Sequence, residues 1–260
     1  MVMAILNATN DSFYKGYLNN SGDEIIELAA KMLEEGAGII DIGGQSTRPG
    51  SQRIPAPEET DRVIPLIELL IKNNPGIVIS IDTYYSTVAN AAVRAGACIV
   101  NDISAGNMDE AMISTVAALK VPYICMHMKG MPETMQQQAV YEDVVKEVLD
   151  FFIDKVDECR KAGINDVIAD PGFGFGKNIA HNFILLKNLA VFKMLNVPLL
   201  AGLSRKSTIY KTLGITADEA LNGTTVLNTI ALMNGANILR VHDTKEAREA
   251  IALVEAYNAP

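Results

Sequence analysis

The 260-residue chain is poor in cysteine, in basic residues and in long hydrophobic runs, and each shortage excludes a class of protein. Its three cysteines (Cys98, Cys125 and Cys159) are odd in number and far apart, and none forms a Cys-x-x-Cys motif. These features exclude a disulfide framework and a zinc knuckle, and they indicate a reducing compartment. The 22 basic residues are outnumbered by 31 acidic ones, and a net charge of −9 argues against sequence-independent nucleic-acid binding.

Signals for secretion or membrane insertion are also missing. Residues 1–6 lack a basic segment followed by a long apolar stretch, so no secretory signal peptide is expected. The longest uncharged run, residues 220–239, contains too many asparagine, threonine and glycine residues for a membrane span. The sequence therefore predicts a cytoplasmic protein that binds neither membranes nor nucleic acid.

Short apolar runs rich in β-branched residues alternate with longer segments of helical periodicity along the whole chain. We expect eight strands, at residues 4–8, 39–42, 77–81, 98–100, 122–126, 167–169, 197–201 and 237–241. Apolar strands that alternate with amphipathic helices indicate a parallel sheet covered by helices. Eight such units at intervals of roughly thirty residues are typical of an α/β protein with a single (β/α)8 TIM barrel. Without a linker or a repeat, one domain over residues 1–260 is expected.

A doubly wound sheet of the Rossmann or flavodoxin type is the structural alternative. That fold needs a glycine fingerprint directly after its first strand. Residues 7–12 read Asn-Ala-Thr-Asn-Asp-Ser and contain no glycine. The sequence therefore favours the barrel.

Two helical segments carry end signals. Residues 23–35 have an apolar face, and Gly36 supplies a left-handed stop after it. The last helical segment follows Asp243, and Asp243 with Glu246 is expected to cap its N-terminus.

Polar residues stand at or just beyond the C-terminal end of each predicted strand. They are Asn7, Asp41, Asp82, Asn101, His127, Asp170, Ser204 with Arg205 and Lys206, and Arg240 with His242. A single residue of this kind can be a helix cap, but polar groups after all eight strands indicate the rim where barrel enzymes assemble their active sites. Carboxylates and amides suit a nitrogen-rich ring or a hard metal ion, whereas cationic side chains suit phosphate. We expect a substrate with a ring at one end and a polyphosphate at the other.

Several other motifs have simpler interpretations. Residues 172–177, Gly-Phe-Gly-Phe-Gly-Lys, resemble a phosphate loop, but that motif requires glycine in place of Pro171 and serine or threonine in place of Asn178. Cys125 is expected to be a buried apolar residue, and His181 to cap or pack against a helix. Lys206 could form a Schiff base with a carbonyl substrate, and the residues alone leave that alternative open.

Segments in a fixed order resemble the signatures of the dihydropteroate synthase family. They include Asn-Ala-Thr-Asn-Asp-Ser-Phe at 7–13, Asp-Ile-Gly-Gly-Gln-Ser-Thr-Arg-Pro-Gly at 41–50, Asp-Pro-Gly-Phe-Gly-Phe-Gly-Lys at 170–177, Ser-Arg-Lys at 204–206 and Arg-Val-His-Asp at 240–243. The Ser-Thr-Arg-Pro-Gly and Ser-Arg-Lys segments distinguish this family from methyltetrahydrofolate-type pterin-binding methyltransferases, the alternative function. Asn10 stands where the family usually has proline, and Gln45 where it usually has glutamate.

The resemblance implies an enzyme of folate biosynthesis that joins 6-hydroxymethyl-7,8-dihydropterin pyrophosphate to p-aminobenzoate and is blocked by sulfonamides. It assigns the pterin to Asp82, Asn101, Asp170 and Lys206. It assigns the pyrophosphate to Asn7, Arg240 and His242, with Mg²⁺ bound by Asn7. It assigns p-aminobenzoate to Phe13, Thr47, Arg48, Pro49, Phe175 and Ser207. The catalytic residues implied are Asp82, Lys206, Arg240 and His242, and the expected assembly is a homodimer.

Overall fold

A computed structural model describes residues 1–8, 22–46, 53–132 and 134–259 of the chain. Eight parallel strands form one sheet in the order β6-β5-β4-β3-β2-β1-β8-β7. The strands are β1 (Val2–Asn7), β2 (Ile39–Gly43), β3 (Ile79–Asp82), β4 (Ile99–Asp102), β5 (Tyr123–Met126), β6 (Val167–Asp170), β7 (Leu200–Ala201) and β8 (Ile238–Val241). All eight predicted strands are confirmed, with shifts at their ends.

The two edges of the sheet meet at β6 and β7. Ala169 and Leu199 form a parallel bridge there, and the Ala169 amide donates to the Pro198 carbonyl over 2.9 Å. Pro198 has no N–H to donate, which helps explain why β7 begins at Leu200 rather than at the predicted residue 197. The bridge completes a (β/α)8 barrel, and the predicted fold class is confirmed.

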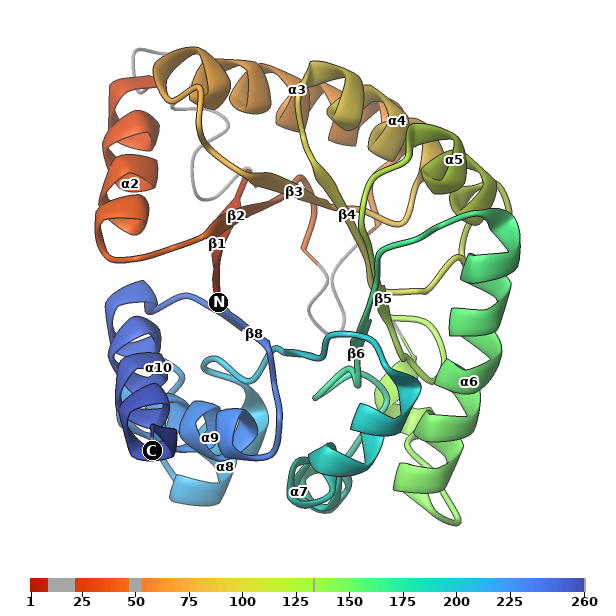
Figure 1. Cartoon of the computed structure of the whole chain (residues 1–260), viewed down its shortest axis with the longest axis vertical. Helices are drawn as coiled ribbons and strands as arrows, with labels where there is room; N and C mark the ends of the chain where they lie inside the picture. Colours follow the sequence, from red (N-terminus) through yellow and green to blue (C-terminus); the bar gives the residue numbers. More distant parts are fainter. Residues whose placement is uncertain (9–21, 47–52, 133, 260) are drawn as a thin grey trace.

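Helices surround the strands on the outside of this barrel (Figure 1). They are α2 (Gly22–Glu34), α3 (Ala56–Asn73), α4 (Ser86–Ala95), α5 (Met112–Leu119), α6 (Val144–Ala162), α7 (Ile179–Lys187), α8 (Ser207–Leu213), α9 (Leu221–Met233) and α10 (Thr244–Asn258), with 3-10 helices η1 (Met135–Gln138) and η2 (Leu189–Leu195). Gly36 follows α2 with a φ of +101°, the left-handed stop that the sequence predicts. Among the described residues, no helix combines the length and the apolar content needed to cross a bilayer.

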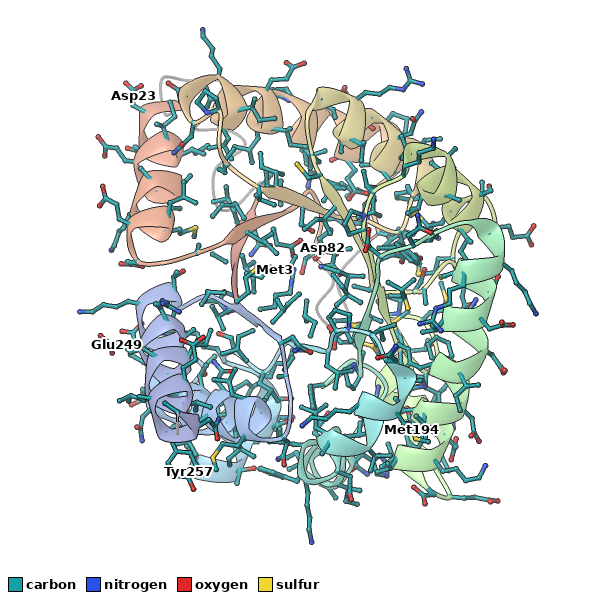
Figure 2. All side chains as sticks on the ribbon, viewed as in Figure 1. Met3, Asp23, Asp82, Met194, Glu249 and Tyr257 are labelled. Carbon is teal, nitrogen blue, oxygen red and sulfur yellow. The ribbon has the colours of Figure 1, made fainter. Side chains whose placement is uncertain are left out.

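Successive residues of each strand point alternately into the barrel and toward the helices. One apolar cluster fills the barrel interior: Met3, Ile39, Ile99, Ile124, Ile168, Leu200 and Ile238. The next residue of each of these strands belongs to the larger cluster that contacts the helices. Figure 2 shows Met3 inside the ring of strands. This two-residue repeat determines which side chains near the carboxyl end of each strand face the mouth of the barrel.

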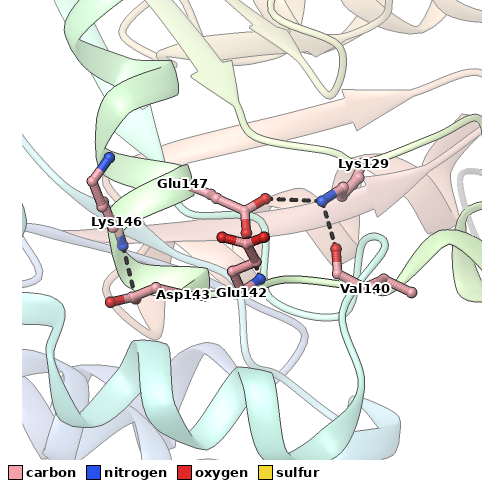
Figure 3. Close-up of a pocket in the computed structure, with 6 residues that line it drawn as sticks. All are labelled: Lys129, Val140, Glu142, Asp143, Lys146 and Glu147. Carbon is pink, nitrogen blue, oxygen red and sulfur yellow. Dashed lines mark hydrogen bonds and ion pairs between the residues drawn. The ribbon is translucent and has the colours of Figure 1, made fainter.

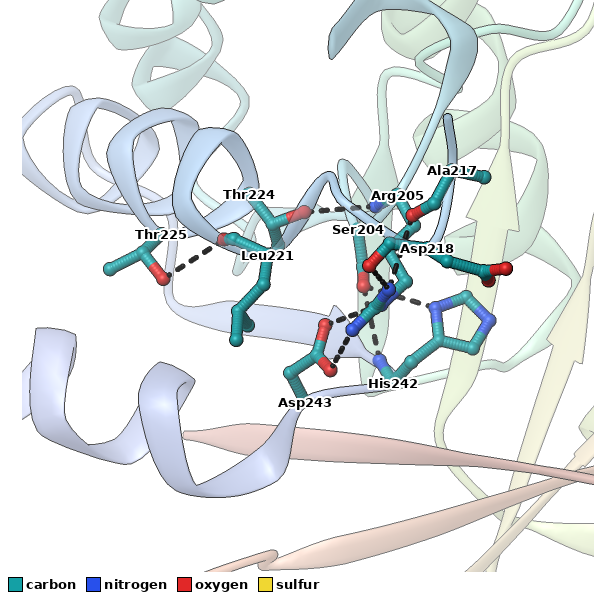
Figure 4. Close-up of polar contacts among 9 residues, drawn as sticks. All are labelled: Ser204, Arg205, Ala217, Asp218, Leu221, Thr224, Thr225, His242 and Asp243. Carbon is teal, nitrogen blue, oxygen red and sulfur yellow. Dashed lines mark hydrogen bonds and ion pairs between the residues drawn. The ribbon is translucent and has the colours of Figure 1, made fainter. Parts of the chain in front are cut away.

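The predicted cap of the last helix is wrong. Asp243 precedes α10 but makes no side-chain cap bond. Its two carboxylate oxygens accept from Arg205, from Nε over 2.9 Å and from Nη2 over 2.8 Å (Figure 4). Arg205 Nη1 also donates to the Ala217 and Asp218 carbonyls over 3.1 and 2.7 Å. A bidentate ion pair with a guanidinium is a stronger interaction for this carboxylate than a neutral backbone N–H, and it joins the segment after β7 to the start of α10.

The other two expectations for single residues are confirmed. Cys125 is fully buried in β5, among the side chains that contact the helices. His181 forms a capping box at the start of α7, where the Asn178 side chain accepts from the His181 amide over 2.8 Å.

Candidate active site

Polar side chains form a layer above the apolar interior of the barrel. Two positions beyond the interior cluster, four of its seven strands carry a polar residue, namely Asp41, Asn101, Asp170 and Arg240, and the other three carry Ile5, Met126 and Gly202. Because side chains two apart share a face, these residues also point inward, toward the carboxyl ends of the strands. In Figure 2 the labelled Asp82 likewise lies inside the ring. The mouth of the barrel is therefore charged.

Arg240 joins three strands at this mouth. Its Nε donates to Asp41 Oδ2 and its Nη2 donates to Asp82 Oδ2, each over 2.6 Å. Asn101 Nδ2 also donates to Asp41 Oδ2, over 3.1 Å. Asp41, Asp82 and Asn101 are all buried. One guanidinium from β8 thus stabilises two buried carboxylates on β2 and β3.

Acceptor capacity remains at this site. Among the described residues, no hydrogen-bond partner contacts the buried oxygens Asp41 Oδ1 and Asp82 Oδ1. Buried polar atoms are nearly always paired, so two such oxygens at the mouth of a barrel indicate a ligand that brings its own N–H donors.

The charge state of Asp82 is also unusual. Burial raises the pKa of its carboxyl from 3.8 to about 7, and the neighbouring carboxylates of Asp41 and Asp170 raise it as well. Arg240 opposes this change because its positive charge stabilises the anion. Asp82 is therefore a carboxyl that titrates near neutral pH.

The side chains of Asp170 and Lys206 both come close to Gly202. A Cβ placed on Gly202 would lie 4.0 Å from Asp170 Oδ2 and 3.7 Å from Lys206 Nζ. Asp170 Oδ1 accepts from the Gly172 amide over 2.8 Å, whereas Lys206 Nζ donates to the Phe173 carbonyl. Burial lowers the pKa of Lys206 to about 8, and the Asp170 carboxylate opposes this change. Lys206 is thus a desolvated cation opposite a carboxylate.

Three further predicted residues lie around this centre. Asn7 ends β1 and is in register with Gly43, which pairs in turn with Asp82. A Cβ at Gly43 would lie 3.8 Å from Asn7 Oδ1 and 3.7 Å from Asp82 Oδ2, so the glycine leaves space between them. Phe175 places its ring 4.8 Å from Lys206 Nζ, and Ser207 begins α8 directly after that lysine.

His242 lies farther out, beside Ser204. Its Nδ1 is 3.0 Å from Ser204 Oγ, and its backbone amide donates to the same hydroxyl over 3.2 Å (Figure 4). The side chain is exposed, which suits a group that meets a charged substrate at the rim.

The family described as "Pterin binding enzyme" matches residues 3–242. The chain belongs to this family. It is 44% identical to the dihydropteroate synthase of Escherichia coli (strain K12) over 257 residues, 98% of this chain and 90% of the relative. Identity to the dihydropteroate synthase of Haemophilus influenzae is 42%, over 98% of this chain and 93% of the relative.

Solved structures of the family superpose closely. The dihydropteroate synthase of Yersinia pestis with a sulfonamide drug complex has a TM-score of 0.93 at 40% identity, covering 100% of this chain and 94% of that one. The Xanthomonas albilineans enzyme with 4-aminobenzoic acid has a TM-score of 0.91 at 38% identity, covering 100% and 93%. The family resemblance of the sequence is confirmed.

The structure brings most of the predicted pterin-binding enzyme site together. Asn7, Asp82, Asn101, Asp170, Lys206 and Arg240 all lie at the carboxyl ends of the strands. Phe13, Thr47, Arg48 and Pro49, with the departure at Asn10, lie outside the described residues. The roles assigned to individual residues stay predictions.

Two features of this site were not assigned from the sequence. The family resemblance assigns no specific role to Asp41, although Asp41 binds both Arg240 and Asn101. The second feature is Gln45, just after β2. Its Nε2 donates to Glu59 Oε2 of α3 over 2.8 Å, and its side-chain oxygen accepts from the Tyr84 hydroxyl over 2.7 Å. Burial raises the pKa of Glu59 to about 8. Only the two-residue strand repeat, which places Asp41 on the face of Ile39, could have indicated the first feature.

Asp82 should titrate near pH 7 in the folded protein, as followed by ¹³C NMR of the aspartate carboxyl carbons. Arg240→Met should raise this pKa further, because the variant loses the cation that stabilises the carboxylate. Since the folded-state pKa lies above the ordinary value of 3.8, the contribution of Asp82 to stability should fall as pH rises from about 4 to about 7. Asp82→Asn assigns the signal, and a pKa of about 4 would contradict the burial argument.

Proposed function

We propose that the chain acts as a dihydropteroate synthase, a transferase that joins 6-hydroxymethyl-7,8-dihydropterin pyrophosphate to p-aminobenzoate. Relatives at 44% and 42% identity carry that name over nearly the whole chain. The observation that carries the proposal is the polar layer. There, carboxylate oxygens of Asp41 and Asp82 that have no hydrogen-bond partner among the described residues lie near two partly buried cations, Lys206 and Arg240. Such a layer fits a substrate with ring N–H donors and a negatively charged tail.

The carboxylate side of the layer suits the pterin ring. A pterin presents an amino group and a ring N–H side by side, and a carboxylate accepts both. Asp170 would accept this pair, while Asp82 and Asn101 would bind other ring nitrogens. Lys206, which like Asp170 comes close to Gly202, would donate to the oxygen and N5 side of the ring.

The cationic side suits the pyrophosphate. Arg240 and His242 would bind its oxygens, and Asn7 would reach it through Mg²⁺. The residues fit that ion, since Mg²⁺ usually takes one or two protein oxygens with water and substrate phosphates. In the described ranges, no group of three His, Cys, Asp or Glu residues could bind a metal by itself. When bound, Mg²⁺ would neutralise charge that develops on the leaving pyrophosphate.

The reaction then needs positioning more than a strong base. The bond between the pterin methylene carbon and the pyrophosphate oxygen breaks, and the electron-rich ring stabilises the positive charge left on the carbon. The arylamine nitrogen forms the new carbon–nitrogen bond and loses one proton. Arg240 and His242 would stabilise the leaving group, and such preorganised charge is usually the largest catalytic contribution.

The p-aminobenzoate half would lie next to Lys206. Phe175 and Ser207 are the described residues of this predicted pocket, and both neighbour that lysine. Phe13, Thr47, Arg48 and Pro49 would close over the same substrate. The Xanthomonas albilineans relative contains 4-aminobenzoic acid and the Yersinia pestis relative a sulfonamide drug complex, so we expect sulfonamides to compete at this pocket. The cytoplasmic location stays a prediction.

We also propose a homodimer through the outer face of α7, η2 and α9. No Asp, Glu, Lys or Arg occurs in α9, although this helix lies on the outside of the barrel. It exposes Val226, Ile230 and Met233, and Met194 of η2 is 68% exposed. Asn234, which follows α9, donates to the Leu186 carbonyl of α7, so these elements adjoin. This face is largely apolar, with Lys187 of α7 and Lys193 of η2 as its exposed lysines. A largely apolar outer face supports a self-complementary contact with a second copy.

Ile230→Arg should convert the dimer into a monomer, because it places a charge in the centre of the apolar face. Sedimentation equilibrium of the wild type should give twice the chain mass, and the variant should give the chain mass. Leu253→Arg, at an exposed position on α10, is the matched control and should stay dimeric. A monomeric wild type would refute the dimer.

Turnover tests the proposed function directly. With the pterin pyrophosphate as substrate, the wild type should release pyrophosphate rapidly only when p-aminobenzoate and Mg²⁺ are both present. Chelation should stop turnover without unfolding the protein, because few protein atoms would bind the ion. Activity that required a corrinoid protein would favour the methyltransferase alternative instead.

Asp170→Asn should abolish most pterin binding while the protein stays folded. Loss of a charge-assisted bidentate contact costs about 2–4 kcal/mol, or roughly 30-fold to several-hundred-fold in affinity. Calorimetry with the pterin pyrophosphate measures this loss. Asp166→Asn, just before β6, is the matched control, and unchanged affinity of Asp170→Asn would exclude the assigned role.

A further inference from the structure

The glycine-rich segment after β6 ends in a lysine whose ammonium points into the protein. Lys177 is 2% exposed. Its Nζ lies 2.8 Å from His127 Nδ1 and donates to the His127 carbonyl over 3.2 Å. It also donates to the Gly172 and Phe175 carbonyls over 3.0 and 3.1 Å. A phosphate-loop lysine points toward its ligand, whereas this ammonium lies among three backbone carbonyls and a histidine nitrogen.

The backbones that this ammonium joins come very close together. Gly172 has a φ of +70°, and a Cβ there would lie 2.0 Å from the His127 carbonyl oxygen. Gly176 has a φ of +62°, and a Cβ there would lie 2.3 Å from the Lys129 carbonyl oxygen. Only glycine allows such an approach. The segments after β5 and β6 therefore touch, and Lys177 binds carbonyls on both.

This junction is directly connected to the polar layer. The Gly172 amide donates to Asp170 Oδ1 over 2.8 Å, and the His127 amide donates to the Asp170 carbonyl over 3.0 Å. Farther along the same segment, Phe173 accepts from Lys206 Nζ and Phe175 lies against it. The 170–177 segment thus carries the Asp170 carboxylate and the Phe175 ring of the proposed substrate site, and it accepts a hydrogen bond from the Lys206 ammonium.

We propose that Lys177 is a positioning residue that fixes the 170–177 segment against the segment after β5. It thereby sets the orientation of the Asp170 carboxylate, the Lys206 ammonium and the Phe175 ring. Loss of its ammonium leaves the His127 and Phe175 carbonyls without the donor that the structure gives them, whereas the Gly172 carbonyl still accepts from the Phe175 amide over 3.1 Å. The segment must then rearrange to bring those two carbonyls to water. The inference rests on the proposed function for turnover, whereas its effect on pterin affinity can be measured without turnover.

Lys177→Met tests this role, because methionine occupies similar space without a donor. Its affinity for the pterin pyrophosphate, measured by calorimetry, should fall about 10- to 100-fold, the scale of a site displaced by about 1 Å. The KM for p-aminobenzoate should rise as well, because Phe175 moves with the segment. Both measurements are made well below the unfolding temperature of each variant, with circular dichroism to confirm folding.

The matched control is Lys129→Met, the same change in the neighbouring segment. Lys129 lines a cavity of about 380 Å³ beside the start of α6. Its Nζ donates to the Glu147 carboxylate over 2.9 Å and to the Val140 carbonyl (Figure 3). Its side chain is 36% exposed, and its ammonium contacts no residue of the 170–177 segment among the described interactions. In Lys129→Met, the affinity for the pterin pyrophosphate and the KM for p-aminobenzoate should both stay within about twofold of the wild type.

A folded Lys177→Met with wild-type pterin affinity and wild-type KM would overturn the proposal. If that variant does not fold, Lys177→Gln decides. Its amide has two N–H donors where the ammonium has three, so its pterin affinity should still fall at least about threefold, although less than in Lys177→Met. Wild-type affinity in Lys177→Gln would then overturn it. A wild type that binds the pterin but releases no pyrophosphate would refute the proposed function alone, because the pterin measurement would still test Lys177.

Discussion

The ion pairs of Arg240 determine what the mouth of the barrel can do. Asp41 is fully buried and Asp82 nearly so, and burying two carboxylates costs free energy unless a cation pairs with them. One guanidinium contacts both and still leaves Asp41 Oδ1 and Asp82 Oδ1 without donors among the described residues. The site therefore keeps its charge and also keeps acceptors for a ligand. Burial raises the pKa of Asp82 and the charge of Arg240 lowers it, and the resulting pKa is about 7.

Much of this site could be predicted from the sequence because a barrel strand has a simple repeat. The apolar residue Ile168 identifies the inward face of β6, and Asp170, two positions later, must share that face. The same reasoning places Asn101 above Ile99. Since every parallel strand ends at the same rim, residues far apart in the sequence meet there. The fold and the polar layer both follow from this alternation.

The remaining features depend on distances between segments, which spacing in the sequence does not encode. Asp243 has the right position for a helix cap, but Arg205 of the preceding unit competes for its carboxylate. Lys177 has nearly the right position for a phosphate loop, but the approach of residue 172 to His127 places carbonyls around its ammonium instead. In both cases a local motif is overridden by a stronger partner from another strand–helix unit. A contact of that kind can be identified only in the folded structure.

The residues proposed to bind the substrates come partly from strands and partly from a loop. Asp82, Asn101 and Arg240 are strand residues whose positions follow from the backbone ladder of the barrel. Asp170 also ends a strand, but its carboxylate accepts from a loop amide, and Phe175 lies wholly in that loop. A loop has no ladder, so it needs cross-links of its own to present a carboxylate and a ring in one geometry. Lys177 supplies that cross-link from within the loop, which explains why a lysine is buried there beside two glycines rather than exposed to phosphate.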